Sequence, residues 1–367
     1  MDPRIIKLAD ILVSYSVEIK PGDLVRIRLI DPLAEPLALA VYKRVLEAGG
    51  NPFIRMGPAD TQEVFLKHAS DAQLAYINPV AKFELETIDV DIVLVAESNT
   101  KALSNIDPGR IAKARAATMP LSKIWMERQS SGALRWTLTQ FPTQASAQDA
   151  EMSLGEYEDF VYGACMLHLD DPVAYWKAKA AEQQRLVDWL NSKERLEVKG
   201  EHINLTMSIK GRTWINAKGD KNFPDGEIFT GPVEDSVNGW VRFSYPAVYS
   251  GREVDGAELW FENGRVVKAT AQKGGDFLNS VLDTDAGART LGEFAIGTND
   301  GIKEFTRNIL FDEKIGGTVH MAVGAGFPET GSSNQSAVHW DMICDMRSGG
   351  EIVVDGTLFY KDGKFKV

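Results

Sequence analysis

The sequence predicts an α/β amino-terminal domain followed by a β-rich α+β carboxyl-terminal domain. Strand and helix patterns alternate along the first half, which is typical of a parallel α/β layer. The second half contains short alternating strands punctuated by Asn-Gly and Asp-Gly turns. A chain of 367 residues is long for one core and suits two domains. We place the boundary after a predicted helix, which gives domains of residues 1–192 and 193–367.

The elements of the first half follow from apolar runs and the turn residues between them. A Lys-Pro-Gly-Asp turn at 20–23 separates an amphipathic segment from the first strand, and Gly49-Gly50 is a suitable helix stop. In chain order, the predicted elements are a helix at 3–18, a strand at 24–29, a helix at 33–48, a strand at 52–56, a helix near 60–70 and a buried strand at 91–96.

A helix at 172–190 closes the first half, because Asp171 suits an N-cap and Pro172 suits the first helical turn. Beyond it, apolar and polar residues alternate as in half-buried strands, and Asn263-Gly264 indicates a hairpin. The predicted strands of this part lie at 203–209, 258–262 and 265–270.

The charge balance excludes some classes of partner. The chain carries 40 Lys and Arg against 52 Asp and Glu, a formal net charge of −12. A protein that neutralises nucleic-acid phosphates needs the opposite balance, so we expect no nucleic-acid partner. The two cysteines offer no disulfide framework and indicate a reducing compartment. With no apolar run of membrane-spanning length and no secretory signal pattern, we expect a cytoplasmic protein with no membrane partner.

Several common catalytic motifs are absent from the sequence. It contains no His-Glu-x-x-His zinc motif, no Gly-x-Ser-x-Gly nucleophile elbow and no phosphate-binding P-loop. Gly324-Ala325-Gly326 begins like a dinucleotide fingerprint, but Glu329 stands where the third glycine is required. These absences disfavour α/β serine hydrolases, P-loop enzymes and Rossmann dehydrogenases.

Histidine and carboxylate side chains gather in predicted strands of the second half. In the segment 337–342, the period of two sends His339 and Asp341 to one face and Trp340 to the other. Such a pair binds one divalent metal ion or bridges two, although a hydrogen-bonded structural pair has the same pattern. His320 lies between apolar neighbours in another strand, where a satisfied core histidine is the alternative interpretation.

Two acidic residues stand in apolar surroundings. Glu227 follows a turn and precedes apolar residues, and Glu293 lies inside an apolar strand bounded by glycines. A lone buried acid is costly unless it is paired or metal-bound. A metal site therefore competes with a second interpretation, in which Glu293 belongs to an edge strand and faces water.

These residues fall in four long, ordered segments. They are NFPDGEIFTGPVEDSVNG (222–239), RTLGEFAIGTN (289–299), GGTVHMAVGAGFPETG (316–331) and NQSAVHWDMICDMR (334–347). The segments resemble the motif blocks of the thermophilic aminopeptidases, the metallopeptidase family of aminopeptidases T and S. Because they cover most of the second half, the resemblance is specific. The first half, including KPGDLVRIR, is similar to the family's amino-terminal domain but less diagnostic.

The resemblance implies a homodimer with an enclosed active-site cavity, two divalent metal ions per chain in the carboxyl-terminal domain, and removal of amino-terminal residues from peptides. The positions that match the family's metal ligands are Glu227, Glu293, His320, His339 and Asp341. A sixth family ligand is a tyrosine, and this sequence has Phe327 at that position. Phenylalanine cannot bind a metal, which bears on metal occupancy and rate. Tyr245 and Tyr249 are alternative sources of a phenol.

Charge counting supports two cations independently of the resemblance. Glu227, Glu293 and Asp341 carry three negative charges, which two divalent ions and one bridging hydroxide balance. At about 4 Å and an effective dielectric of about 20, two carboxylates repel by roughly 4 kcal/mol, so a single cation balances them poorly. We expect zinc, cobalt or manganese ions that activate water for peptide hydrolysis. Asp341 is the expected bridging ligand, and Glu227 or Glu293 is the expected general base.

Two other functions fit part of the pattern. His320, His339 and Asp341 alone form a two-histidine, one-carboxylate triad, which is the arrangement of non-haem iron oxygenases. Ring-cleaving dihydroxypyridine dioxygenases are similar to the aminopeptidase family, but a mononuclear site has no need of the two glutamates. The other alternative is a catalytically silent relative that binds peptides or metal without turnover, and Phe327 motivates it.

Overall fold

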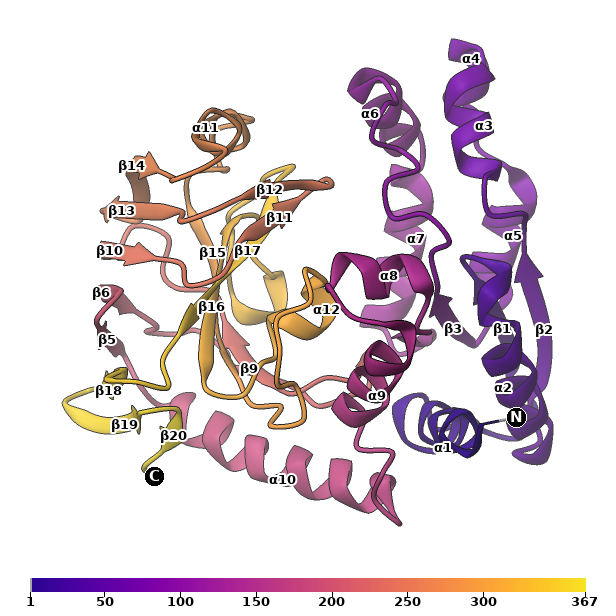
Figure 1. Ribbon diagram of the computed structural model, residues 1–367, viewed down its shortest axis with the longest axis horizontal. Helices are drawn as coiled ribbons and strands as arrows, with labels where there is room; N and C mark the ends of the chain where they lie inside the picture. The colour runs from indigo at the N-terminus through magenta and orange to yellow at the C-terminus, as the bar shows by residue number, and fades with distance from the viewer. Residues whose placement is uncertain (1) are drawn as a thin grey trace. The chain divides into compact units, whose positions relative to one another are not determined.

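The structure, a computed structural model, describes residues 2–367 and divides into two compact units (Figure 1). The first unit extends to Val173 and includes Gly219–Phe223, and the second contains Ala174–Lys218 and Pro224–Val367. The predicted boundary after residue 192 is therefore wrong. The helix that precedes it belongs to the second unit, because its side chains Leu186, Val187 and Leu190 lie in the core of that unit.

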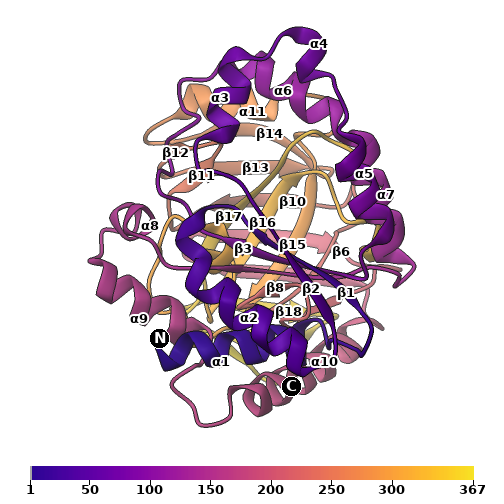
Figure 2. The ribbon, with the colours of Figure 1, turned by 90° about the vertical axis from the view of Figure 1, so that its right-hand side faces the viewer.

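The first unit is built on a parallel sheet of strand order β2-β1-β3-β4-β8, as the alternating pattern predicts. Its strands are β1 (Leu24–Leu29), β2 (Asn51–Met56), β3 (Val90–Val95), β4 (Arg135–Gln140) and β8 (Asn222–Phe223). Its helices are α1 (Pro3–Ile11), α2 (Glu35–Glu47), α3 (Thr61–His68), α4 (Asp71–Leu74), α5 (Pro79–Thr87), α6 (Pro108–Ala117), α7 (Met119–Ser130), α8 (Gln144–Asp149) and α9 (Leu154–Ala164). A π-helical turn at Leu12–Ser16 extends α1, a 3-10 turn at Pro32–Ala34 precedes α2, and α2 packs on β1 and β2 (Figure 2).

The second unit contains antiparallel sheets of strand order β14-β13-β10-β6-β5-β18-β19-β20, β17-β16-β15-β9-β7 and β11-β12. Its strands are β5 (Arg195–Gly200), β6 (Ile203–Ser208), β7 (Ile215–Ala217), β9 (Glu227–Thr230), β10 (Asn238–Arg242), β11 (Ala247–Tyr249), β12 (Arg252–Val254), β13 (Glu258–Glu262), β14 (Arg265–Thr270), β15 (Leu291–Gly297), β16 (Thr318–Gly324), β17 (His339–Asp345), β18 (Glu351–Val354), β19 (Thr357–Lys361) and β20 (Lys364–Phe365). Its helices are α10 (Pro172–Leu190), α11 (Gly275–Leu282), α12 (Ile309–Asp312) and a 3-10 turn at Pro328–Thr330. The predicted α10 and the predicted β13–β14 hairpin are confirmed.

One face of the five-stranded sheet forms part of the main apolar core of this unit. Because side chains alternate along a strand, every second residue points to that core. The buried residues that do so include Ile228, Phe294, Ile296, Val319, Met321, Trp340 and Met342. The residues between them in the sequence therefore point to the opposite face of the same sheet.

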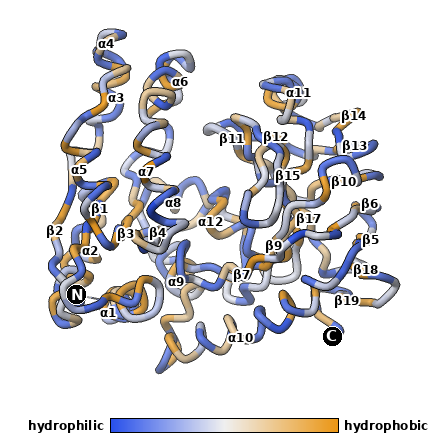
Figure 3. The backbone as a smooth tube through the Cα atoms, turned by 180° about the vertical axis from the view of Figure 1, so that it is seen from behind, coloured by the Kyte–Doolittle hydropathy of each residue, from blue (hydrophilic) through white to orange (hydrophobic). Residues whose placement is uncertain are grey.

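The second unit begins with helix α10, along which hydrophilic and hydrophobic stretches alternate (Figure 3). Its buried Gln183 donates a hydrogen bond from Nε2 to the carbonyl oxygen of Glu227 at 2.9 Å. The side-chain oxygen of Gln183 accepts a hydrogen bond of 3.1 Å from Thr298. One helix residue thus links the start of β9 to the end of β15.

Gly226 fixes the direction in which β9 begins. Its φ is +122°, and an added Cβ would lie 2.9 Å from the Cβ of Asn299. A side chain at this position would meet both backbone strain and a close contact, so glycine is required immediately before Glu227.

Among residues 2–367, no helix is both long enough and apolar enough to cross a membrane.

Candidate metal centre

The predicted site residues come together on the sheet β17-β16-β15-β9-β7 of the second unit, on the face that points away from the core. Glu227 lies on β9, Glu293 on β15, His320 on β16, and His339 and Asp341 on β17. The register places Ala322 between Glu293 and Asp341 on neighbouring strands, and Gly297 opposite Glu227. These small residues leave room above the sheet for the larger polar side chains.

Glu293 does not face water from an edge strand. Its strand β15 lies between β16 and β9, and the residue is 4% exposed. The edge-strand interpretation is therefore wrong, and the buried carboxylate requires polar or ionic partners.

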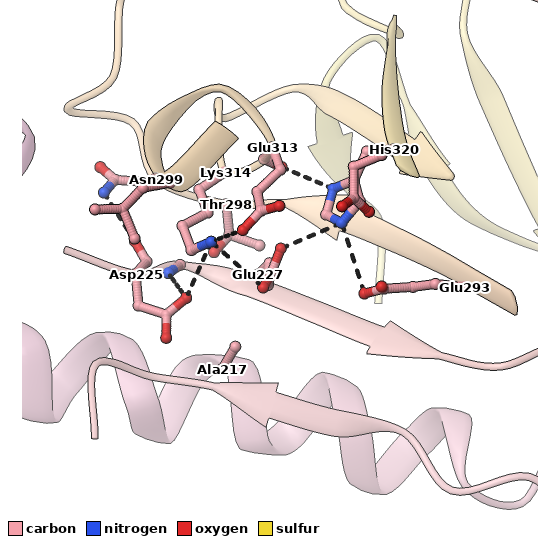
Figure 4. A network of polar contacts seen from close by, with 12 residues as sticks. Ala217, Asp225, Glu227, Glu293, Thr298, Asn299, Glu313, Lys314 and His320 are labelled. Carbon is pink, nitrogen blue, oxygen red and sulfur yellow. Dashed lines mark hydrogen bonds and ion pairs between the residues drawn. The ribbon is translucent and has the colours of Figure 1, made fainter. Parts of the chain in front are cut away.

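The carboxylates surround the Nε2 atoms of the two imidazoles. Nε2 of His320 lies 3.4 Å from Oε2 of Glu227 and 3.6 Å from Oε1 of Glu293, as Figure 4 shows. Nε2 of His339 lies 3.2 Å from Oε2 of Glu293 and 3.5 Å from Oδ2 of Asp341. We call these five residues the five-residue cluster. Glu293 contacts both imidazoles and so connects its two halves.

Main-chain carbonyl groups orient both imidazole rings. Nδ1 of His320 donates to the carbonyl oxygen of Glu313 at 2.8 Å, and Nδ1 of His339 donates to that of Ala325 at 2.8 Å. A hydrogen bond at Nδ1 fixes the ring and directs Nε2 into the cluster, which is the usual arrangement around a metal-binding histidine.

The cluster fits a cation. Among the described residues, Oε2 of Glu227 and Oδ1 of Asp341 are buried without a hydrogen-bond partner. Candidate donor atoms of Glu293, His339 and Asp341 lie within 4.8 Å of one another. A second such group contains Glu313, His320 and Asp341. Two metal–ligand bonds of about 2.1 Å span ligand atoms up to about 4.2 Å apart, so small movements suffice for binding.

Without a cation, both imidazoles of the cluster have raised pKa values. Burial alone would lower the pKa of His320, but Glu293 and Glu227 raise it to about 10. Burial acts in the same way on His339, and Asp341 and Glu293 raise its pKa to about 10. Burial raises the pKa of Glu227 well above its ordinary value, although Lys314 opposes this effect. A metal ion must displace protons from both imidazoles, so its affinity falls as the pH falls.

The pKa values of the other two carboxylates of the cluster shift in opposite directions, although burial raises both. Hydrogen bonds to His320 and His339 outweigh the effect of burial on Glu293 and lower its pKa to about 2. Burial dominates at Asp341 and raises its pKa to about 6, despite the charge of His339.

A buried lysine that the sequence analysis missed lies beside the cluster. The side chain of Lys314 is 0% exposed, and its Nζ lies 3.6 Å from Oε1 of Glu227 and 4.0 Å from Oδ1 of Asp225. It also forms an ion pair with Glu313 (Figure 4). Burial lowers the pKa of Lys314, but the surrounding carboxylates outweigh it and raise the pKa. The sequence signal was a charged Asp-Glu-Lys segment between apolar Phe311 and Ile315.

Phe327 lies next to the cluster, as the alignment of motifs predicts. Its ring contacts the ring of His339 edge-on at 5.0 Å between centroids and that of Phe229 at 5.3 Å. Neither alternative phenol replaces a tyrosine at this position. The ring of Tyr245 stacks on Phe305, and its hydroxyl accepts a hydrogen bond from Arg347. The ring of Tyr249 packs against Trp340, whose side chain lies on the core face of the sheet.

Comparison with known proteins adds the decisive observation. The model of the family described as thermophilic metalloprotease (M29) matches residues 1–365. The chain belongs to the M29 family. Aminopeptidase 2 of Geobacillus stearothermophilus is 28% identical, over 98% of this chain and 94% of the relative. Aminopeptidase T of Thermus thermophilus is 30% identical, over 73% of this chain and 72% of the relative. The predicted family and the predicted class, a metal-dependent peptidase, are confirmed.

The fold of this M29 chain is also that of solved structures. The structure of AmpT from Thermus thermophilus has a TM-score of 0.86 at 23% identity, covering 100% of this chain and 99% of the other. A 2,5-dihydroxypyridine dioxygenase from Pseudomonas putida has a lower TM-score of 0.59 at 12% identity, covering 99% of this chain and 97% of the other. Both similarities concern the fold alone, and the TM-score shows that the fold of AmpT is the more similar of the two.

Proposed function

We propose that this M29 chain is an aminopeptidase that removes amino-terminal residues from peptides with two divalent cations per chain. The supporting observation is the convergence of two imidazoles and three carboxylates on one sheet face, where two buried carboxylate oxygens of the described residues have no hydrogen-bond partner. The proposed ligands are Glu227, Glu293, His320, His339 and Asp341. When bound, zinc, cobalt or manganese ions lower the pKa of a water molecule and polarise a carbonyl group.

Each carboxylate has a proposed role. Asp341 is the shared ligand, because it belongs to both groups of candidate donor atoms. Glu293 lies between the imidazoles and holds their relative positions. Glu227 is the proposed general base, since its buried Oε2 has no hydrogen-bond partner among the described residues and lies next to His320. It takes a proton from the attacking water and returns it to the leaving amine.

The substrate reaches the cluster from the side of His339. The side chain of His339 is 31% exposed, whereas that of His320 is 1% exposed. On that side, Phe327 and Phe229 present two apolar rings. We propose that the amino-terminal end of a peptide lies against these rings while its scissile carbonyl faces the cluster.

The oxygenase alternative receives less support than the peptidase. A two-histidine, one-carboxylate iron site needs one acid and keeps other positions open. Here Glu227 and Glu293 are within 3.6 Å of the Nε2 atom of His320, in addition to Asp341 beside His339. So many carboxylates favour two cations over one.

Dipeptide hydrolysis tests this proposal. Metal-free protein is supplied with Co²⁺, Zn²⁺ or Mn²⁺ and incubated with leucyl and other dipeptides, and with N-acetylated copies that lack a free amine. We expect amino-acid release from the free dipeptides only. The variant Glu227→Gln keeps the size of the side chain and should lower kcat by about 100-fold, because it removes the proton acceptor. Glu262→Gln, at an exposed position on β13, is the matched control. No release from any dipeptide with any of these ions overturns the proposal.

We further propose that the protein acts as a homodimer, as its family resemblance implies, and in the cytoplasm, as its cysteine usage indicates. Light scattering during size-exclusion chromatography tests the oligomeric state, and a monomer mass would contradict it.

A further inference from the structure

We infer that Glu234 is a positioning residue for the peptide substrate. Together with Arg212 it holds residues 325–333, which we call the Phe327 loop, and so places the ring of Phe327 for the amino-terminal side chain of the peptide. This inference rests on the proposed function, because it concerns how the same site recognises its substrate. Glu234 follows β9 and Arg212 precedes β7, so both lie outside the strands that carry the proposed ligands.

The amino-terminal part of the Phe327 loop is fixed beside the five-residue cluster. The backbone N–H of Ala325 donates to the carbonyl oxygen of Val338 at 2.7 Å. The carbonyl oxygen of Ala325 in turn accepts the hydrogen bond from Nδ1 of His339. Neither hydrogen bond involves Glu234, so the orientation of the imidazole should survive replacement of that residue.

The carboxyl-terminal part of the loop is held by Glu234 and Arg212. Oε1 of Glu234 accepts hydrogen bonds from the backbone and side chain of Ser333, at 2.7 and 3.0 Å, and from Ser332 at 3.3 Å. The guanidinium group of Arg212 pairs with Oε2 of Glu234 and donates to the carbonyl oxygen of Gly331. The side chain of Arg212 is only 8% exposed. Two side chains thus hold three successive residues of the loop.

Contacts between the two parts of the loop carry this hold to Phe327. Ser332 packs directly against Gly326, since a Cβ added to Gly326 would overlap with Oγ of Ser332. Phe327 follows Gly326, and its carbonyl oxygen accepts hydrogen bonds from the backbone and side chain of Thr330, at 3.0 and 2.7 Å. Release of Ser332 would therefore loosen the backbone on both sides of Phe327.

A neutral side chain of the same size cannot take the place of Glu234. Both of its carboxylate oxygens accept hydrogen bonds, one from Ser333 and the other from Arg212. In Glu234→Gln, the amide NH₂ group would face one of these two donors. Burial raises the pKa of Glu234, but hydrogen bonds from Ser333 and the charge of Arg212 outweigh it and lower the pKa to about 2. The carboxylate is therefore ionised near neutral pH.

Steady-state kinetics of the cobalt-loaded protein with a leucyl and an alanyl dipeptide test the inference. In the proposed binding mode a leucyl side chain buries far more apolar area against Phe327 than the methyl group of alanine does. For Glu234→Gln we expect KM to rise at least about fivefold for the leucyl dipeptide and less than about twofold for the alanyl dipeptide, with kcat within about twofold of wild type for both. Cobalt titration should still give two ions per chain, because the proposed ligands are unchanged.

A second variant and a matched control accompany this measurement. Arg212→Lys keeps the charge, but an ammonium group lacks the planar fork that binds Glu234 and Gly331 together. We expect the same selective rise in KM, smaller than that of Glu234→Gln. The control is Glu258→Gln, since Glu258 of β13 pairs with Arg242 of β10 on the eight-stranded sheet, and it should change KM for neither dipeptide. Urea unfolding checks that each variant is folded in the assay.

Two results would overturn the inference. In the first, both variants keep KM for the leucyl dipeptide within about twofold of the wild-type value. In the second, KM rises equally for both dipeptides or cobalt binding is lost, which would assign Glu234 a general structural role. Either result leaves the proposed function intact if the wild-type protein hydrolyses dipeptides with two ions bound. Wild-type protein that hydrolyses no dipeptide would instead reject the proposed function, and this inference with it.

Discussion

Replacing the buried lysine with methionine, Lys314→Met, tests whether its charge holds the carboxylates beside the metal site. Nζ forms an ion pair with Glu313 and lies 3.6 Å from Oε1 of Glu227 and 4.0 Å from Oδ1 of Asp225. At an effective dielectric of about 20, the attractions to Glu227 and Asp225 alone amount to about 5 and about 4 kcal/mol. Desolvation of the ammonium group offsets part of this sum, and breaking a buried ion pair typically costs about 3–5 kcal/mol. We expect the metal-free variant to lose that amount of unfolding free energy.

Urea unfolding of the metal-free protein measures this loss. Lys361→Met is the matched control, because Lys361 pairs with Glu351 at 2.7 Å on the surface, where its side chain is 43% exposed. Such a pair contributes at most about 1 kcal/mol. The double variant Lys314→Met/Glu227→Gln should be less destabilised than the sum of the single variants, since it removes both charges. A loss at Lys314 no larger than that at Lys361 would refute the reasoning.

Three further predictions concern the surroundings of the cluster. Phe327→Tyr places a phenol beside His339 and should raise cobalt affinity or dipeptide hydrolysis by about tenfold, and no gain in either would show that the site does not use a phenol. Gly226→Ala forces a side chain onto a φ of +122° and should cost about 2 kcal/mol or more in urea unfolding, whereas an unchanged midpoint would contradict the required glycine. Burial raises the pKa of Glu234, but hydrogen bonds from Ser333 outweigh it and lower the pKa to about 2. This carboxylate therefore stabilises the fold above its unfolded pKa of about 4.3 and loses that effect as the pH falls toward 2, so Glu234→Gln should cost about 1–2 kcal/mol near neutral pH and little near pH 2. An equal cost at both pH values would contradict this assignment.

The residues that obey strand periodicity could be placed from the sequence. Period-two alternation puts His339 and Asp341 on one face, and the structure places both opposite the core-facing Trp340. The same alternation explains why His320 and Glu293 reach that face from neighbouring strands.

Residues that act from connecting segments could not be placed in this way. Glu313 and Lys314 follow the short helix α12. Their carbonyl oxygens accept hydrogen bonds from Nδ1 of His320 and from the backbone of Asn299, and no local pattern encodes these long-range contacts. The sequence also left open whether Glu293 lies on an edge strand, because the order of strands in a sheet is set by long-range pairing.

The predicted position of the domain boundary differs from the observed one for a related reason. The pattern predicted α10 with its observed bounds, but helix periodicity does not reveal which core a helix covers. Tertiary packing assigns it to the second unit through Leu186, Val187 and Leu190. The return of Gly219–Phe223 to the first unit, where β8 pairs with β4, likewise depends on contacts distant in sequence.

The most direct test of the account measures metal content and hydrolysis on the same samples. Metal-free protein is titrated with Co²⁺, each sample is freed of unbound ions, and its cobalt is determined by elemental analysis beside its rate of leucine release from a leucyl dipeptide. We predict that hydrolysis appears with bound cobalt and reaches its maximum at about two ions per chain. Full activity without metal, or hydrolysis that reaches its maximum at one cobalt ion per chain, would contradict the account.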